Sequence, residues 1–476
     1  MNKERINSAE MVEGRPSTKG NNQPLTAVRT QSRGVASLGV LGVRRAAQRD
    51  KELKFTALLH HVTVELLRAS FYALEREAAA GIDGMGWYEY EVGLMERLGE
   101  LHSRIHQGRY RARPSRRVYI PKPDGTRRPL GIQCLEDKIV QQAVATVLNA
   151  IYETDFKGFS YGFRPGRSAH DALDALSVAL IKRKVNWVLD ADIQSFYDTL
   201  DHQWMMQFLK HRIADKRLLR LIKKWLEAGV SEEGKVVKLK IGVPQGAVIS
   251  PILSNIYLHY VFDLWSQAWR GRVASGEVIM LRYADDTALG FQHRDEASRF
   301  LEDFKNRLSK FGLTLHPDKT RLIEFGRFAE ENRRRRGEGK PETFDFLGLT
   351  HICSRRHRDG RFTVKRRTVK KRFRKQLQAI KQTLLRYRHV PIPRMGAWLN
   401  RVLQGHYNYY AVPGNLPSLK SFCNQVTRYW LSALRRRSQR HRMTWLRFRE
   451  LIRRWLPRPR ILHPYPDVRF YAIHPR

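Results

Sequence analysis

Residues 281–290 read LRYADDTALG, in which two adjacent carboxylates, Asp285 and Asp286, stand between apolar runs. The apolar residues on either side predict two short β-strands over residues 278–292, joined at Ala-Asp-Asp to form a hairpin. Like charges repel, and an apolar strand end is an unfavourable place to hold a carboxylate. The pair is therefore expected to face positive charge, unless it lies in a solvated surface turn, where Asp is common.

A third carboxylate, Asp192, follows another predicted strand, NWVLDADI over residues 186–193. If the two strand ends meet, the carboxylates form an acidic pocket suited to Mg²⁺, which favours carboxylate oxygens and is usually completed by substrate phosphates. Two such ions about 3.5–4 Å apart stabilise the attacking and leaving oxygens of a phosphoryl displacement. The pattern therefore predicts nucleotidyl transfer. A pair of glycosidase carboxylates is the rival hypothesis.

The charge of the chain favours a polyanion as its partner. The 88 Lys and Arg residues against 46 Asp and Glu residues give a formal net charge of +42, far beyond what solubility requires. Glycosidase chemistry does not explain this charge, whereas nucleic acid binding does. A membrane surface is the other anionic partner, but no apolar run reaches the length of a spanning helix, and the basic residues are spread along the whole chain.

The cysteines and the N-terminus indicate the bacterial cytoplasm. The first residues lack the apolar core of a secretory signal and contain acidic residues, which organellar transit peptides avoid. Three cysteines lie far apart without a CxxC pair, which argues against a disulfide framework or a structural zinc site and fits a reducing compartment: Cys134, Cys353 and Cys423.

Composition and periodicity divide the chain into regions. Residues 1–50 are rich in Gly, Ser, Asn, Gln and Arg without a sustained period, which predicts a mobile basic arm. A basic hairpin is expected over residues 116–132, and apolar residues at helical spacing predict a core helix over residues 137–152. Beyond residue 352 the composition shifts to Arg, Lys and aromatic residues, and a helix with an apolar seam and a cationic exterior is expected from Val369 to Leu384. We expect this last region to contact phosphates.

Seven sequence blocks in chain order resemble those of one enzyme family. They are YIPKPDGTRRPLGI, SYGFRPGRSAHDAL, DADIQSFYDTLDH, GVPQGAVISPILSNIYLH, LRYADD, GLTLHPDKTRL and FDFLGLTH. Their succession is similar to that of the reverse transcriptases encoded by bacterial group II introns. The resemblance implies an α+β right-hand polymerase fold with these parts: an N-terminal arm over 1–50, fingers over 51–185, a palm with an antiparallel sheet over 186–351, and a thumb and maturase region over 352–476.

The resemblance also implies roles for individual residues. Asp192 and Asp285 would bind two catalytic Mg²⁺ ions, and Asp286 would complete the acidic cluster. A ring packed at Tyr197 would leave no room for a 2′-hydroxyl, so deoxynucleotides would be preferred. The residues expected to bind the incoming nucleotide, through its triphosphate, its sugar or the adjacent template, are Lys122, Arg128, Tyr197 and Gln245.

The implied function is RNA-directed DNA synthesis for a group II intron, with maturase activity on the intron RNA. The partners would be that RNA, a DNA primer or target, and deoxynucleoside triphosphates. Two alternatives stay open: a splicing cofactor that acts mainly without polymerisation, and a reverse transcriptase of a bacterial defence or diversity-generating system. The sequence contains no Cys-rich nuclease segment, so second-strand cleavage by this chain is not expected. Three tyrosines near the C-terminus either stack on unpaired bases or fill a helical core: Tyr407, Tyr409 and Tyr410.

Overall fold

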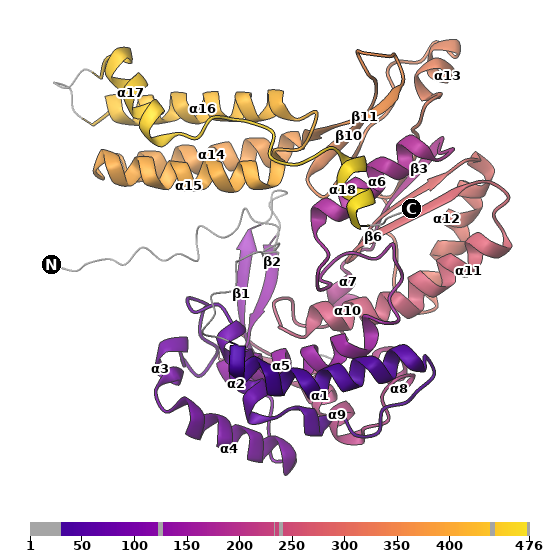
Figure 1. Ribbon diagram of the computed structural model, residues 1–476, viewed down its shortest axis with the longest axis vertical. Helices are drawn as coiled ribbons and strands as arrows, with labels where there is room; N and C mark the ends of the chain where they lie inside the picture. Colours follow the sequence, from indigo (N-terminus) through magenta and orange to yellow (C-terminus); the bar gives the residue numbers. More distant parts are fainter. Residues whose placement is uncertain (1–29, 122–126, 233, 238–240, 438–442, 474–476) are drawn as a thin grey trace.

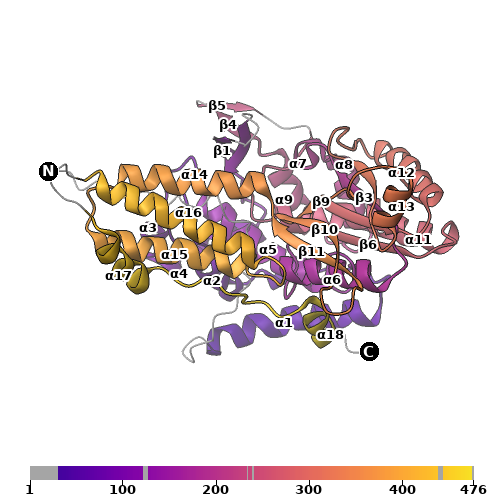
Figure 2. The same cartoon turned by 90° about the horizontal axis from the view of Figure 1, so that it is seen from above.

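The computed structural model describes residues 30–121, 127–232, 234–237, 241–437 and 443–473. Helices surround three β-sheets, and a group of long C-terminal helices extends to one side of them (Figure 1, Figure 2). None of the helices in these ranges combines the length and the apolarity that crossing a bilayer requires.

The first helix, α1 (Thr30–Arg49), contradicts the mobile arm expected over residues 1–50. Val43 is 5% exposed and Ala47 is fully buried, one helical turn apart, and both belong to the same core as helix α5 (Leu135–Tyr152). Burial of this short apolar face stabilises a helix that the Gly- and Arg-rich composition did not suggest. Residues 1–29 of the expected arm lie outside the described residues.

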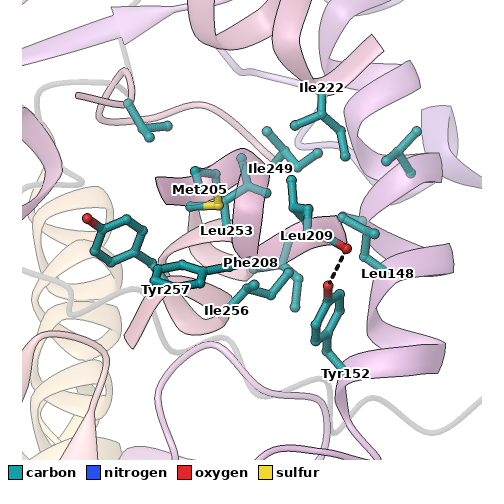
Figure 3. Packing of buried hydrophobic residues seen from close by; sticks show 14 of the residues in the cluster. Leu148, Tyr152, Met205, Phe208, Leu209, Ile222, Ile249, Leu253, Ile256 and Tyr257 are labelled. Carbon is teal, nitrogen blue, oxygen red and sulfur yellow. Dashed lines mark hydrogen bonds between the residues drawn. The ribbon is translucent and has the colours of Figure 1, made fainter. Parts of the chain in front are cut away.

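A first core forms where helices from distant parts of the chain pack against α5 (Figure 3). The predicted core helix over 137–152 is confirmed, and the hydroxyl of Tyr152 donates to the Leu209 carbonyl oxygen at 3.4 Å. Asp201 is the N-cap residue of α8 (His202–Lys210), and its carboxylate accepts from the Trp204 N–H at 2.8 Å. The other helices before residue 230 are η3 (Leu59–His61), α2 (Val64–Ala73), α3 (Trp87–Glu91), α4 (Leu94–His106), α6 (Ala169–Lys182), α7 (Phe196–Thr199) and α9 (Lys216–Glu227).

The predicted basic hairpin is confirmed as β1 (Ser115–Pro121) and β2 (Arg127–Ile132), which pair antiparallel. The Pro-Asp-Gly sequence at 123–125, which predicts the turn of this hairpin, lies outside the described residues. Two strands from a later segment, β4 (Val230–Glu232) and β5 (Lys235–Val237), extend the hairpin to a four-stranded sheet of order β2-β1-β4-β5. The β1–β4 pairing is parallel, with Ser115 opposite Val230, so this sheet joins segments that lie on both sides of the boundary expected near residue 185.

The second sheet has the order β6-β7-β3-β8, and all its neighbouring strands are antiparallel. It confirms the predicted hairpin over 278–292 and the predicted strand over 186–193. Both faces of the sheet are buried: Leu189 and Leu289 belong to the first core, whereas Val188 and Ala288 belong to a second core shared with the C-terminal helices. The strands and the helices of this part are β3 (Trp187–Asp192), β6 (Val278–Tyr283), β7 (Asp286–Phe291), β8 (Arg321–Glu324), α10 (Ser250–Leu258), the π-helical η4 (His259–Asp263), α11 (Leu264–Arg272), α12 (Arg294–Ser309) and α13 (Ala329–Arg335).

The third sheet, β11-β10-β9, shows that the domain boundary expected near residue 352 is misplaced. That residue lies inside β10 (Leu349–Arg355), which pairs with β9 (Phe344–Phe346) and β11 (Phe362–Thr368) on its two sides. The helices that follow are α14 (Lys370–Arg386), α15 (Ile392–Tyr410), α16 (Leu416–Arg435), α17 (Trp445–Trp455) and α18 (Pro466–Ile473).

The C-terminal helices enclose the second core. The predicted seam from Val369 to Leu384 is present in α14, where Leu377, Ile380 and Leu384 are buried. Tyr407 and Tyr410 are buried as well, at 1% and 7% exposure, and the half-buried Tyr409 donates its hydroxyl to the Leu347 carbonyl oxygen at 2.7 Å. Of the two hypotheses for these tyrosines, the helical core is therefore the one that the structure supports.

Candidate active site

The central sheet brings the predicted carboxylates together. Asp192, the last residue of β3, and Asp286, the first residue of β7, are register partners in the antiparallel pair, and Asp285 lies in the adjoining turn. Directly opposite residues of such a pair have Cα atoms about 4.5–5.5 Å apart. Residues distant in the sequence thus form one acidic cluster at the end of the sheet.

The two neighbouring aspartates of the hairpin lie in different surroundings. Asp192 and Asp286 line a cavity of about 400 Å³ between the sheet and the start of α14, and Asp285 is not among its lining residues. Asp285 instead lies within electrostatic range of Tyr197 and of Arg128 on β2. The cluster therefore presents carboxylates in two directions.

Burial and the charges of neighbouring carboxylates raise the pKa values of Asp285 and Asp286. Desolvation by the surrounding protein, followed by the charges of Asp285 and Asp192, raises the pKa of Asp286 to about 7, although solvent reaches its side chain through the cavity. Desolvation also raises the pKa of Asp285, and the charge of Asp192 adds to this effect, while Arg128 and Arg282 oppose it. Negative charge is thus held in excess at this site, and a cation between the carboxylates would relieve it.

Three cations line the cavity beside the carboxylates. Lys319 donates from Nζ to Asp192 Oδ2 at 2.8 Å, and Arg321 lies 3.9 Å from Asp190. Arg372, from the first turn of α14, lowers the pKa of Asp286 by its charge. These side chains supply part of the positive charge that the adjacent carboxylates require. Sequence reasoning missed Lys319 and Arg372, although Lys319 stands in the GLTLHPDKTRL block.

The buried guanidinium of Arg282 holds the turn of the β6–β7 hairpin in place. Arg282 is 0% exposed and donates to both carboxylate oxygens of Asp263, at 2.7 and 2.6 Å, and at 3.0 Å to each of Asn255 Oδ1 and the Ala284 carbonyl oxygen. Although burial alone would raise it, the pKa of Asp263 is held below its ordinary value by Arg282. The network ties the turn of the hairpin to helix α10 and to the π-helical segment η4.

The turn itself is packed against a glycine. Ala284 has a φ of 55°, a left-handed conformation that is uncommon for a residue with a side chain. A Cβ at Gly162 would lie 2.2 Å from the Ala284 nitrogen, and the Gly162 carbonyl oxygen accepts from Asn255 Nδ2 at 2.7 Å. Gly162 belongs to the SYGFRPGRS block, so this block contacts the turn that carries Asp285.

Two of the residues expected to bind the nucleotide, Tyr197 and Arg128, lie within electrostatic range of Asp285. Tyr197, in α7, is half-buried, with its hydroxyl 3.5 Å from Ser254 Oγ, and burial followed by the charge of Asp285 raises its pKa to about 12. Arg128 is exposed on β2 and acts electrostatically on both Asp285 and Tyr197. Lys122 lies outside the described residues.

Gln245 contacts both the β1–β2 hairpin and the segment after Asp192. Its side-chain amide donates to the carboxylate of Asp198 at 3.4 and 3.5 Å, and its backbone carbonyl oxygen accepts from the Gly131 N–H of β2 at 2.8 Å. The side chain is therefore oriented by contacts of the protein itself, next to the strand that carries Arg128.

The donor set suits a cation that shares its coordination with a substrate. Among the described residues, no three His, Cys, Asp or Glu side chains converge as a closed metal cage. Mg²⁺ does not need one, because it usually keeps waters and binds one or two carboxylates together with substrate phosphates. Asp285 and Asp286, whose pKa values are raised by burial and by the charge of Asp192, meet this description together with Asp192.

Comparison with known proteins finds similarity to a family model and to several curated proteins. Residues 120–351 match the family described as reverse transcriptase (RNA-dependent DNA polymerase). The chain is 34% identical over 314 residues to Protein YkfC of Escherichia coli (strain K12), which covers 58% of this chain and 81% of YkfC. It is 39% identical over 168 residues to the group II intron-encoded protein LtrA of Lactococcus lactis subsp. cremoris, covering 34% of this chain and 27% of LtrA. A shorter match, 31% identical over 112 residues, is to nuclear intron maturase 2, mitochondrial, of Arabidopsis thaliana, covering 22% of this chain and 15% of the maturase.

Proposed function

The chain belongs to the reverse transcriptase family, among the group II intron-encoded reverse transcriptases and maturases, and on this premise we propose that it extends a DNA primer on an RNA template at the cluster of Asp192, Asp285 and Asp286. Its fold is that of a right-hand polymerase. The observation that carries the proposal is the register pairing of Asp192 with Asp286, beside Asp285, in a protein of net charge +42.

The carboxylates would hold the divalent metal on which this family generally depends. Two Mg²⁺ ions bound by Asp192 and Asp285, with Asp286 completing the cluster, would supply charge stabilisation at the primer hydroxyl and at the leaving pyrophosphate. The role of Arg282 is to fix the turn that carries Asp285, so that this carboxylate is oriented before substrate binds.

The incoming deoxynucleotide would lie on the Asp285 side of the cluster. Arg128, with Lys122 close to it in sequence, would bind the triphosphate, because a guanidinium and an ammonium both suit phosphate oxygens. The ring of Tyr197 would close the space that a 2′-hydroxyl needs. Gln245 would contact the nucleotide and template from the β2 side.

The three sheets also indicate the limits of the fingers, palm and thumb subdomains. We assign the fingers to α1–α5 and the β2-β1-β4-β5 sheet, the palm to the β6-β7-β3-β8 sheet with its helices, and the thumb and maturase region to residues from about 369 onwards. The exposed Lys and Arg residues of α14–α17 would contact intron RNA and the primer–template duplex. We place the protein in the bacterial cytoplasm in association with nucleic acid.

Extension of a DNA primer on an RNA template, measured over a Mg²⁺ titration, tests the proposal. Loss of a metal-binding carboxylate removes several kcal/mol of transition-state stabilisation. The extension rates of Asp192→Ala and Asp285→Ala should therefore fall by about a thousandfold or more. Asp318→Asn is the matched control, because Asp318 lines the same cavity outside the strand pair. Extension by Asp285→Ala at the wild-type rate would refute the assignment.

The same variants separate polymerisation from maturase function. Binding of intron RNA depends on the basic surface and not on the carboxylates, so Asp285→Ala should still promote splicing of its intron RNA. Loss of both activities in a folded Asp285→Ala protein would show that the two functions share one site.

A further inference from the structure

Three basic segments meet at the end of the central sheet that lies opposite the carboxylates. Lys184 precedes β3, Arg327 follows β8, and Trp187 of β3 is the register partner of Glu324 at the end of β8. Asp192 lies at the other end of β3, five residues from Trp187, or about 17 Å along an extended strand. We call residues 182–184, 327–340 and 355–361 together the distal basic surface.

Contacts hold the three segments of the distal basic surface together. Arg327 donates from Nη2 to the carbonyl oxygens of Ile181 and Arg183, at 3.4 and 3.3 Å. Arg355, at the end of β10, forms an ion pair with Glu330 of α13 at 3.4 Å. Figure 1 shows α13 beside the β10–β11 hairpin at the outer edge of the molecule. The three segments therefore form one continuous surface.

The charge of this surface is high even for this protein. Its 24 residues contain 13 Lys and Arg against 4 Asp and Glu, a net charge of +9. The chain average of +42 over 476 residues corresponds to about +2 for a stretch of the same length. Positive charge is thus concentrated here about fourfold.

Most of these cations are available to an external partner. Five of them form ion pairs with Asp or Glu side chains. Within the described part of the chain, the other eight are exposed and form no ion pair: Lys182, Arg183, Lys184, Arg327, Arg334, Lys340, Arg356 and Arg358.

Local structure explains only part of the charge. Arg333, Arg334 and Arg335 lie in the last turn of α13, where cations interact favourably with the helix dipole. The same reason applies to Lys182, in the last turn of α6, and to Arg183, its C-cap residue, but not to the turn of the β10–β11 hairpin, where Arg356 and Arg358 stand. Like charges on three separate segments repel one another, and a polyanion would remove that repulsion.

We propose that the distal basic surface binds the phosphate backbone of folded RNA, at a site separate from the primer–template duplex. The inference rests on the proposed function, in which intron RNA is a partner. A folded RNA large enough to contact the polymerase site and also the opposite end of the sheet would neutralise both surfaces. Guanidinium groups suit this role because they bind phosphate oxygens in a bidentate manner and carry their charge at all physiological pH values.

A triple variant, Arg334→Ser with Arg356→Ser and Arg358→Ser, tests the surface without breaking an ion pair. The matched control removes the same charge from exposed cations on α8 and α9 that also form no ion pair within the described residues: Lys210→Ser, Lys216→Ser and Arg220→Ser. Filter binding would measure the Kd of each protein for a folded group II intron transcript at several KCl concentrations. Circular dichroism and thermal unfolding would show that both variants are folded.

The distal variant should bind the transcript at least about tenfold more weakly than the control at the same salt. Its plot of log K against log [KCl] should be flatter by about 0.9 for each phosphate that the variant no longer neutralises, or up to about 2.7 for three. Affinity for a short RNA–DNA primer–template duplex, and extension of that primer, should equal those of the control. Equal Kd and slope for the transcript in the two variants would overturn the proposal, as would an equal loss of affinity for the short duplex.

The same measurements separate this inference from the proposed function. Failure of the wild-type protein to extend a primer, with the expected loss of transcript binding in the distal variant, would overturn the polymerase assignment and support the RNA surface. Normal extension by the wild-type protein, with unchanged transcript binding in the distal variant, would support the polymerase assignment and overturn the RNA surface.

Discussion

Replacement of Arg282 by methionine should lower the free energy of unfolding by about 3–5 kcal/mol, the usual cost of breaking a buried ion pair. The side chain is 0% exposed and makes four hydrogen bonds, two of them to Asp263, which is also 0% exposed. Methionine fills a similar volume but leaves the Asp263 carboxylate in the interior without its guanidinium partner, with only the His259 imidazole nearby, at 3.8 Å. It also removes the donor to the Ala284 carbonyl oxygen, so the turn that carries Asp285 loses its support.

Two further variants identify the cause of this loss. Arg299→Met removes a surface ion pair with Asp303 at 4.0 Å, in which the two side chains are 68% and 43% exposed, and should change stability by less than about 1 kcal/mol. Arg282→Met combined with Asp263→Leu removes both buried charges and should be more stable than Arg282→Met alone. The double variant should still have low activity, because the Ala284 carbonyl remains without its donor.

Urea unfolding, followed by tryptophan fluorescence, measures these differences, and primer extension on the same samples measures the effect on the site. The expected order of stability is wild type, then Arg299→Met, then the double variant, then Arg282→Met. The reasoning is wrong if Arg282→Met is as stable as Arg299→Met, or if the addition of Asp263→Leu destabilises it further.

Three other outcomes follow from the geometry of the site. The pKa of Asp286, raised from 3.8 to about 7, means that the folded metal-free protein binds a proton that the unfolded chain has already released. Its stability should therefore fall as pH increases from about 4 to 7, and urea midpoints across this range should show a smaller fall for Asp286→Asn. Tyr197→Val should increase ribonucleotide incorporation relative to deoxynucleotide incorporation on the order of tenfold, in competition assays where Tyr197→Phe behaves as wild type. Gly162→Ala places a Cβ 2.2 Å from the Ala284 nitrogen and should cost about 1–3 kcal/mol in thermal unfolding and impair extension, whereas Gly158→Ala, with open space around it, should do neither.

The strands and helices that sequence reasoning predicted correctly are those whose pattern is local. The apolar runs of β3, β6 and β7 and the helical spacing in α5 are visible within short windows, and each element appears where it was expected. The approach of Asp192 to Asp285 and Asp286 was predicted from the chemistry that carboxylates at two strand ends suggest. The register that places Asp192 opposite Asp286 is long-range and was seen only in the structure.

The errors arose where distant contacts override local composition. Helix α1 is stabilised by the burial of Val43 and Ala47 against a later helix, which no local pattern reveals. The role of Arg282 was not predicted, because a single arginine is not distinctive in a protein with 88 Lys and Arg residues. One signal was available: an arginine within the apolar strand VIMLRY must find an internal partner if that strand is buried.

The parallel pairing of β1 with β4 has a consequence for the order in which this protein acquires its shape on the ribosome. Residues 115–121 emerge early, but the partner for their open edge is made only once residues 230–232 have been translated. Until then the open edge of β1 in the nascent chain exposes unpaired backbone N–H and C=O groups, with which other chains could pair. Because strand pairing over so large a sequence separation is slow, translation pauses before residue 230 should promote aggregation more than pauses after residue 237.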